Sequence, residues 1–199
     1  MQKRNLLYAA LLSAAVFLFS KCNDQKPAAI AANFGGYESQ VKWGEHLVLS
    51  GGCGDCHTPK KMGPMGPVDD SALLLSGHPA QMPLPDIDRK MLEQKGIAAT
   101  QTLTFWIGPW GVSYAANLTP DSTGVLAWTE EQFINCLRTG VSKGITGNRR
   151  LLPPMPWNST RHLTDDELKA MFAYIKTIKP VKNVVPQPLP PVAPPPAAK

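Results

Sequence analysis

The clearest hydrophobic spacing in the chain falls between residues 163 and 178. Apolar side chains recur there at positions i, i+3, i+4 and i+7, which line one face of an α-helix: Leu168, Met171, Phe172 and Ile175. Thr164 followed by Glu167 is the sequence signature of a capping box, and Pro180 stops the helix. We therefore predict an amphipathic helix over residues 163–178 that packs one face against a core.

A second helix is predicted over residues 129–139. Thr129 with Gln132 again forms a capping-box signature, and Gly140 suits the backbone conformation that ends many helices. Its apolar face consists of three residues: Phe133, Ile134 and Leu137. Cys136 lies in the same helix, and we interpret it as a small buried apolar residue rather than as a metal ligand.

The pattern also indicates a helix from Tyr37 to Leu49, which Gly51 and Gly52 end. Its inner face is expected to contain Val41, Leu47 and Val48. Gly44 in the middle of this helix lowers its stability relative to Ala. A glycine makes sense there if another helix crosses closely, and the alternative is that it is merely tolerated.

The segment from residue 58 to residue 100 has the weakest signals. Turn-like dipeptides occur at residues 58–59 and 63–64. Short helices are indicated at residues 71–75 and 86–94.

Residues 101–116 differ in character from the segment before them. Threonine and aromatic residues flank Gly108 and Pro109, which predicts a strand–turn–strand. The aromatic side chains either line a flat apolar cofactor or belong to the core, and the sequence favours neither.

The beginning of the chain carries a targeting pattern. A basic start and an apolar run as far as Phe19 predict a signal peptide over residues 1–21, because the run is too short to cross a membrane comfortably. Cys22 follows directly and resembles the lipidated first residue of a bacterial lipoprotein, although Lys21 stands where small residues are usual. The alternative is a secreted protein with an incidental cysteine.

The domain organisation follows from these composition changes. Residues 22–36 are predicted to form a flexible tether and residues 37–182 a folded domain. Residues 183–199 are Pro- and Ala-rich, and we predict an exposed tail after Pro186 rather than packed structure. The mature protein is expected to be periplasmic and anchored to a membrane through lipidated Cys22.

The charge of the chain argues against nucleic acid as a partner. The net charge of +5 falls to +2 when the signal peptide is removed, because Lys3, Arg4 and Lys21 leave with it and no acidic residue does. No basic stripe with interleaved aromatic residues is present in the sequence.

The most specific motif is the C-x-x-C-H run of Cys53, Cys56 and His57. Two thiols three positions apart can each bond one vinyl group of a haem, and the adjacent imidazole then reaches the iron. A zinc half-site would need a second ligand pair, and a thioredoxin-type pair would need a βαβ pattern, neither of which the sequence contains. A plain disulfide leaves His57 unexplained. The motif therefore predicts covalent attachment of a c-type haem.

Met155 is the candidate for the opposite face of the iron. Pro154 and Pro156 flank it and hold the backbone extended, so a soft thioether is presented with little conformational freedom to lose. The alternative is that Met155 is an apolar plug beside Trp157. The other candidates are interpreted as surface or structural residues: Met62, Met65, Met82, Met91, His46, His78 and His162.

The order of helix, C-x-x-C-H, helix, Met loop (residues 151–157) and final helix resembles class I cytochrome c over residues 37–179. Residues 173–175 resemble that family's Ala-Tyr-Leu segment, whose aromatic ring packs near a glycine of the first helix, here Tyr174 on Gly44. Residues 108–121 resemble a bacterial subgroup of single-haem cytochromes. The segment between the haem motif and the later helices is longer than in a minimal cytochrome.

This resemblance implies an all-α fold of the class I cytochrome c type, with an inserted loop and short hairpin after the haem motif. It also implies one haem c per chain, with its iron held by His57 and Met155. An iron with both ligands offers no position to a substrate, so we expect an electron carrier between redox partner proteins rather than an enzyme. The alternatives are a haem-based redox or gas sensor and a cytochrome subunit of a dehydrogenase complex.

Overall fold

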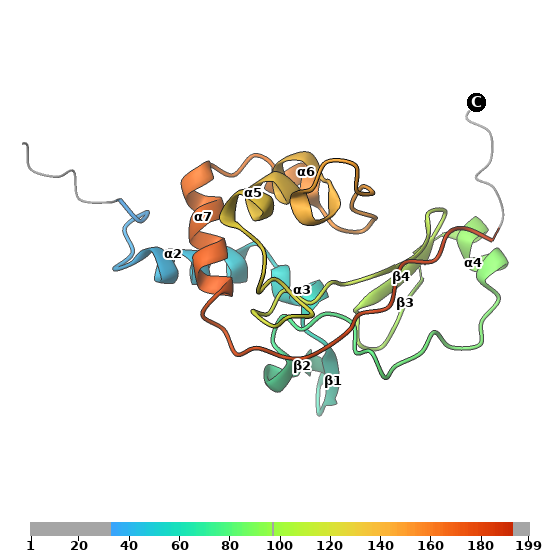
Figure 1. Cartoon of the computed structure of the whole chain (residues 1–199). Helices are drawn as coiled ribbons and strands as arrows, with labels where there is room; N and C mark the ends of the chain where they lie inside the picture. The colour runs from blue at the N-terminus through green and yellow to red at the C-terminus, as the bar shows by residue number, and fades with distance from the viewer. Residues whose placement is uncertain (1–32, 97, 193–199) are drawn as a thin grey trace, which may run out of the picture. The chain divides into compact units, whose positions relative to one another are not determined.

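A computed structural model describes residues 33–96 and 98–192 (Figure 1). The predicted signal peptide and Cys22 lie outside the described residues. The elements below belong to the unit Phe34–Lys199. Within the described ranges, no helix has the length and apolar character needed to cross a membrane.

Helices α2 (Gln40–Ser50) and α7 (Asp165–Ile175) are far apart in the sequence but pack against each other (Figure 1). They cross at Gly44, where an added Cβ would overlap the carbonyl group of Ala170 and lie 3.0 Å from the Cβ of Tyr174. The predicted close crossing at this glycine is therefore confirmed, since a larger residue would hold the two backbones apart.

Both predicted capping boxes are present. In α7 the side chain of Thr164 accepts a hydrogen bond from the backbone N–H of Glu167, whose carboxylate accepts one from the backbone N–H of Thr164. Thr129 and Gln132 make the same reciprocal pair at the start of α5 (Glu130–Thr139). These local bonds satisfy N–H groups that a helix leaves without partners, so both helices begin where the sequence predicts.

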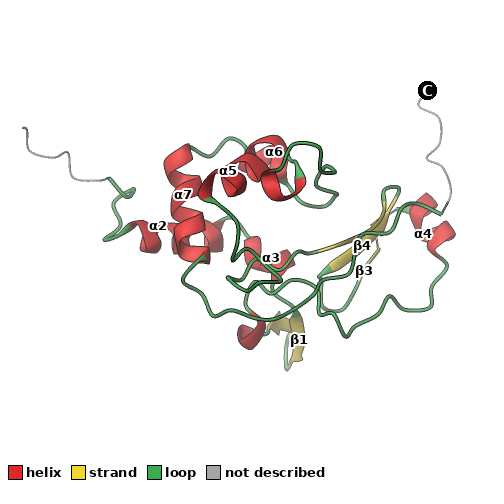
Figure 2. Cartoon of the chain, in the orientation of Figure 1, coloured by secondary structure: helices red, strands yellow, loops and turns green. Residues whose placement is uncertain are grey.

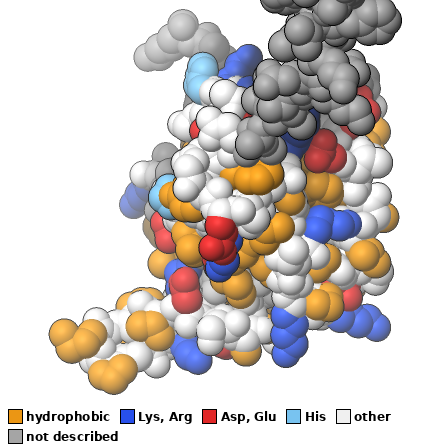
Figure 3. All heavy atoms as spheres, turned by 90° about the vertical axis from the view of Figure 1, so that its left-hand side faces the viewer, with side chains coloured by type: hydrophobic (Ala, Val, Ile, Leu, Met, Phe, Trp, Pro, Cys, Tyr) orange, Lys and Arg blue, Asp and Glu red, His pale blue; other side chains and the backbone are white. Residues whose placement is uncertain are grey.

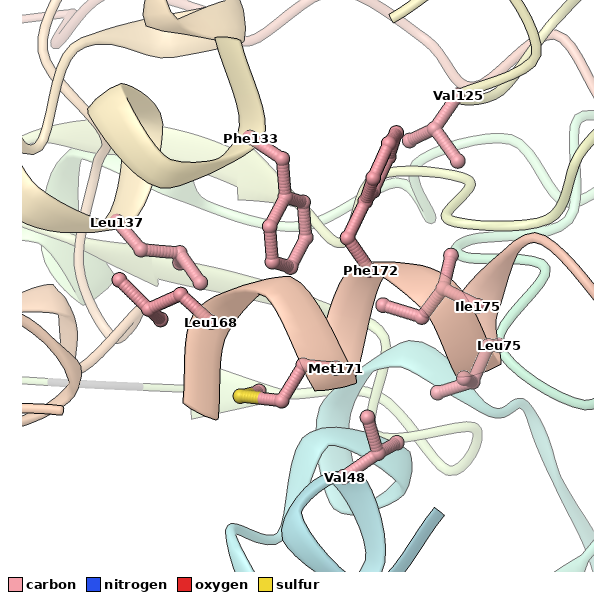
Figure 4. Packing of buried hydrophobic residues seen from close by; sticks show 9 residues of the cluster. All are labelled: Val48, Leu75, Val125, Phe133, Leu137, Leu168, Met171, Phe172 and Ile175. Carbon is pink, nitrogen blue, oxygen red and sulfur yellow. The ribbon is translucent and has the colours of Figure 1, made fainter. Parts of the chain in front are cut away.

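One hydrophobic core joins α2, α5 and α7 (Figure 4). Its nine buried residues are Val48, Leu75, Val125, Phe133, Leu137, Leu168, Met171, Phe172 and Ile175. The rings of Phe133 and Phe172 stack with their centroids 5.1 Å apart. Cys136 is buried on α5, as predicted, and the short helix α6 (Trp157–Thr160) packs against α5.

The expectation of an all-α fold is wrong (Figure 2). The described residues contain two antiparallel sheets, so the structure is mixed α/β. One sheet is the hairpin of β1 (Lys60–Gly63) and β2 (Gly66–Asp69), and the other has the order β3 (Ala98–Ala99), β4 (Phe105–Gly108) and β5 (Gly111–Tyr114). Both sheets lie in the long segment between the C-x-x-C-H motif and α5.

The reason for the larger sheet is a second hydrophobic core. Phe105, Ile107 and Val112 are buried together, and the side chains that cover them come from the same long segment and from the C-terminal part of the chain. The predicted strand–turn–strand over residues 101–116 is confirmed as β4 and β5, and Phe105 belongs to the core. The two short helices predicted earlier in this segment are also present, as η1 (Ser71–Leu73) and α4 (Arg89–Lys95).

The chain after α7 does not leave the domain as an exposed tail. The side chain of buried Asn183 donates to the carbonyl oxygens of Ser76 and His78 and accepts from the N–H of Ala80. Leu189 then exchanges two backbone hydrogen bonds with Val112 of β5. The prediction of an unpacked tail is therefore wrong for the described residues after Pro186, because this segment covers the edge of the sheet.

Candidate functional site

The C-x-x-C-H motif forms its own short helix, α3 (Cys53–His57). Gly52 has a φ of +66°, a left-handed conformation that glycine adopts without steric cost, and it turns the chain from α2 into α3. Cys53 and Cys56 lie three positions apart in this helix, so they share a face. The fold therefore presents both thiols and His57 on one five-residue helix, which suits the attachment of a single planar group.

The imidazole of His57 is held in a defined orientation. Its Nδ1 lies 2.8 Å from the carbonyl oxygen of Ala116. A carbonyl only accepts hydrogen bonds, so Nδ1 carries the proton and the lone pair of Nε2 is left for a metal. Burial lowers the pKa of His57, although the bond to Ala116 opposes this, so the ring is neutral at neutral pH. This is the form of histidine that binds iron, and a backbone carbonyl on the other nitrogen is the usual support for such a ligand.

Before haem is attached, both cysteines of the motif are protonated at neutral pH. Burial raises the pKa of Cys53 to about 11, and burial together with the charge of Asp55 raises the pKa of Cys56. No disulfide joins the two sulfur atoms. Across residues 33–96 and 98–192, no cluster of three or more His, Cys, Asp or Glu side chains is arranged to hold a metal ion. The residues present fit a haem attached through two thioether bonds better than zinc.

Met155 lies in the loop between η2 (Ser142–Gly144) and α6. It is half-buried and packs against the first hydrophobic core, as does Cys53. The backbone N–H of Met155 donates to the carbonyl oxygen of Leu152. The carbonyl oxygen of Met155 accepts a hydrogen bond from the N–H of Trp157, which begins α6. Backbone bonds therefore hold the Met loop on both sides of Met155, and this residue packs against the same core as the first cysteine of the motif.

A second contact connects the Met loop to the inserted sheet. Ser113 of β5 donates a hydrogen bond of 2.6 Å to the carbonyl oxygen of Pro153, and its own oxygen accepts one from Nε1 of Trp110. Ser113 and Ala116 are three residues apart, so at most about 10 Å of extended chain separates the support of the Met loop from the support of His57. One short segment thus contacts both parts of the predicted site.

Sequence reasoning missed the residues that hold the site in place. Ala116 acts through its backbone, which leaves no trace in the sequence. No motif in the sequence assigns a role to Lys60, yet its Nζ donates to the carbonyl oxygens of Gly54 and Thr58 at the end of α3. A lysine three residues beyond a short helix is the available signal, because such side chains often bond the last carbonyl groups of a helix.

Comparison with known proteins agrees with this geometry. The family model described as Cytochrome c matches residues 41–179. The chain is similar to the fructose dehydrogenase cytochrome subunit of Gluconobacter japonicus, with 26% identity over 147 residues, which are 73% of this chain and 23% of that protein. It is also similar to the gluconate 2-dehydrogenase cytochrome c subunit of Pantoea cypripedii, with 29% identity over 138 residues, which are 69% of this chain and 23% of that protein.

A shorter stretch is 38% identical to the cytochrome c subunit of the quinone-dependent alcohol dehydrogenase of Gluconobacter oxydans, over 76 residues that are 37% of this chain and 15% of that protein. The chain thus spans less than a quarter of the length of each of these three relatives. The likeness therefore concerns one domain of larger proteins.

Proposed function

The chain belongs to the cytochrome c family, whose cofactor is covalently bound haem c with its iron, and from this premise we propose that it carries single electrons between redox proteins of a bacterial cell envelope. In this proposal one haem c is attached through Cys53 and Cys56, and His57 and Met155 bind its iron from opposite faces. When bound, haem c supplies a one-electron redox couple.

The contacts of the segment from Ser113 to Ala116 carry the ligand assignment. The bond from His57 to Ala116 leaves Nε2 with its lone pair for iron, and the bond from Ser113 to Pro153 holds the Met loop near the same segment. Met155 also shares its core with Cys53. These contacts favour Met155 over the exposed methionines as the second ligand.

A ligand on each face of the iron argues for electron transfer rather than catalysis. A substrate would have to displace one of the two ligands, and a thioether ligand raises the reduction potential of haem iron. The chain is therefore proposed to act on no substrate of its own.

We further propose that the electron donor is a dehydrogenase. The relatives reported above are cytochrome subunits named for fructose dehydrogenase and gluconate 2-dehydrogenase, and a chain that matches only part of them would supply the electron-accepting domain. Export through the signal peptide of residues 1–21 and anchoring through lipidated Cys22 complete the proposal, since haem c attachment is expected outside the cytoplasm.

The test replaces Met155 with Ala in protein that carries its haem. We expect the haem to stay covalently attached, while the weak thioether–iron absorption band disappears, the reduction potential falls and carbon monoxide binds rapidly. Met82→Ala is the matched control, because this methionine is 40% exposed and should leave all three readouts unchanged.

Two results would contradict the proposal. An unchanged absorption band in Met155→Ala would mean that another residue is the second ligand. Rapid binding of carbon monoxide by the unaltered protein at neutral pH would mean that the iron has an open position, as in a sensor or an enzyme.

A further inference from the structure

The β1–β2 hairpin ends in an uncharged, exposed apolar tip. Residues 62–68 contain only Met, Gly, Pro and Val. Met62 is 72% exposed, Met65 98% and Val68 44%. Figure 1 shows the hairpin extending from the lower edge of the domain, and Figure 3 shows hydrophobic side chains gathered on the lowest projection of the surface. Contiguous apolar residues on a projection are typical of a contact surface rather than of scattered surface hydrophobes.

The charges at the base of the hairpin are paired within it. Lys60 on β1 lies 2.7 Å from the carboxylate of Asp69 on β2, and Lys61 lies 3.6 Å from that of Asp70. Within each pair the lysine and the aspartate neutralise each other, so the hairpin has an apolar tip on a base without net charge. A complementary surface is therefore an apolar recess without a strong charge of either sign.

The hairpin is fixed to the helix that carries the C-x-x-C-H motif. The side chain of Lys60 is only 9% exposed, and its Nζ donates to the carbonyl oxygen of Gly54 at 2.8 Å and to that of Thr58 at 2.9 Å. β1 begins three residues after His57. A partner that holds the tip is consequently held beside the segment to which haem is attached.

The tip is also suited to binding without a large loss of freedom. Pro64 and Pro67 fix two of its backbone φ angles, and Gly66 closes the turn with a φ of +123°. A preformed backbone lowers the entropy lost on association. The flexible thioether side chains of Met62 and Met65 can adapt to the shape of a recess, as methionines do on other binding surfaces.

From these observations we propose that residues 62–68 dock into an apolar recess of the protein that exchanges electrons with this cytochrome. The proposal rests on the electron-carrier function above. Encounters between redox proteins bury little area, so a single hairpin supplies a substantial part of the contact. A lipid surface fits less well, because the tip lacks aromatic residues and unpaired basic residues, which are typical of segments that lie in a membrane interface.

The experiment compares the haem-containing protein with a double variant, Met62→Ser and Met65→Ser. The electron donor is the washed membrane fraction of the source bacterium, given respiratory substrates, and the reduction of the cytochrome is followed by absorbance. We expect the cytochrome concentration that half-saturates this rate to rise at least about tenfold, since burial of one methionine side chain corresponds to a factor of ten or more in affinity. The rate with ascorbate and the reduction potential should not change.

Met91→Ser is the matched control, because Met91 is 42% exposed and lies on α4, outside the hairpin. Its half-saturating concentration should equal that of the unaltered protein. An unchanged value in the double variant, an equal rise in Met91→Ser, or an equal slowing with ascorbate would each overturn the docking role.

Other occupants of the tip give different results. Sedimentation of the protein with protein-free phosphatidylcholine and phosphatidylglycerol vesicles, lost in the double variant, would mean that the tip binds lipid. Concentration-dependent dimerisation lost in the double variant would mean that it binds a second copy. Failure of the membranes to reduce even the unaltered protein would instead contradict the electron-carrier function itself.

Discussion

A methyl group added at Gly44 tests whether the α2–α7 crossing limits the stability of the fold. In Gly44→Ala the new Cβ would overlap the carbonyl oxygen and carbon of Ala170, far inside the 3.0 Å limit that real Cβ atoms keep, and would touch the Cβ of Tyr174 at 3.0 Å. The obstacle is backbone, so no change of rotamer relieves it. The two helices would have to move apart by about 1 Å, roughly a tenth of their usual axial separation.

The cost of this movement falls on the first hydrophobic core, because Val48 on α2 packs against the buried face of α7. Overpacking usually costs about 1–3 kcal/mol, and we expect about 4 kcal/mol here because backbone must move. Alanine regains about 1 kcal/mol through its better helix propensity. The expected net loss of about 3 kcal/mol is a large part of a total stability of about 5–15 kcal/mol. It corresponds to a fall in Tm of about 6–12 °C.

Urea and thermal unfolding of the haem-containing protein measure this loss. Gly54→Ala is the control, because a Cβ there lies 3.5 Å from Oγ1 of Thr58 and 3.9 Å from Oδ2 of Asp69, which are ordinary contacts. The control should lose no more than about 1 kcal/mol. A loss of less than about 1 kcal/mol in Gly44→Ala would show that the helices separate freely and that the crossing does not constrain the fold.

Two further predictions concern the inserted segment. Ser113→Ala leaves the carbonyl of Pro153 and the indole N–H of Trp110 without their partner, so it should cost about 1–3 kcal/mol of unfolding free energy and speed the binding of carbon monoxide, whereas Ser113→Thr keeps the hydroxyl and should restore both; equal behaviour of the two variants would refute the role of the hydrogen bond. Burial lowers the pKa of His78 in the folded protein. Below the ordinary histidine pKa of about 6.5 the unfolded chain therefore binds more protons than the folded protein, and the free energy of unfolding should decrease as the pH is lowered, by up to about 1.4 kcal/mol per pH unit. Urea titrations from pH 7 to pH 5 should show that His78→Gln makes this slope shallower while the exposed His46→Gln keeps it, and a slope unchanged in His78→Gln would contradict the assignment.

The helices were predictable because their signals are local. Thr129 and Thr164 each make a capping bond three residues along, so the sequence contains both partners of each bond. The apolar face of α7 follows from spacing within a single element. The close helix crossing at Gly44 was predictable for the same reason, since a glycine inside a helix indicates that another helix approaches it even before that helix is known.

The small sheets were not predictable in the same way. The β1–β2 hairpin contains Lys, Gly and Pro, which have low strand propensity, and only the turn at residues 63–64 was visible in the sequence. Its strands are stabilised by ion pairs at its base and by the bonds of Lys60 to α3, which depend on tertiary structure. The C-terminal segment was predicted to be exposed because of its prolines, but Leu189 pairs with Val112, 77 positions away along the chain.

The parts of the site that consist of side chains were predictable from the sequence, and the parts that consist of backbone groups were not. The C-x-x-C-H motif names its cysteines and histidine in five consecutive residues. The carbonyl of Ala116 orients His57 from 59 positions away and has no side-chain signature. From the sequence, His78 is interpreted only as a surface or structural residue, because loop-like sequence flanks it. In the structure it is buried, and its partners are Thr104 and the carbonyl oxygen of Met82.

These contacts give the long inserted segment a physical role. The backbone N–H of Gly77 donates to the carbonyl of His57, while Ala116 accepts from its ring and Ser113 holds the carbonyl of Pro153. All three supports come from residues between the motif and α5. A residue that binds a metal keeps its geometry only when neighbouring groups fix its rotamer and its loop. The insertion therefore acts as the frame of the proposed haem site, and a deletion that removes residues 113–116 would take support from both His57 and the Met loop.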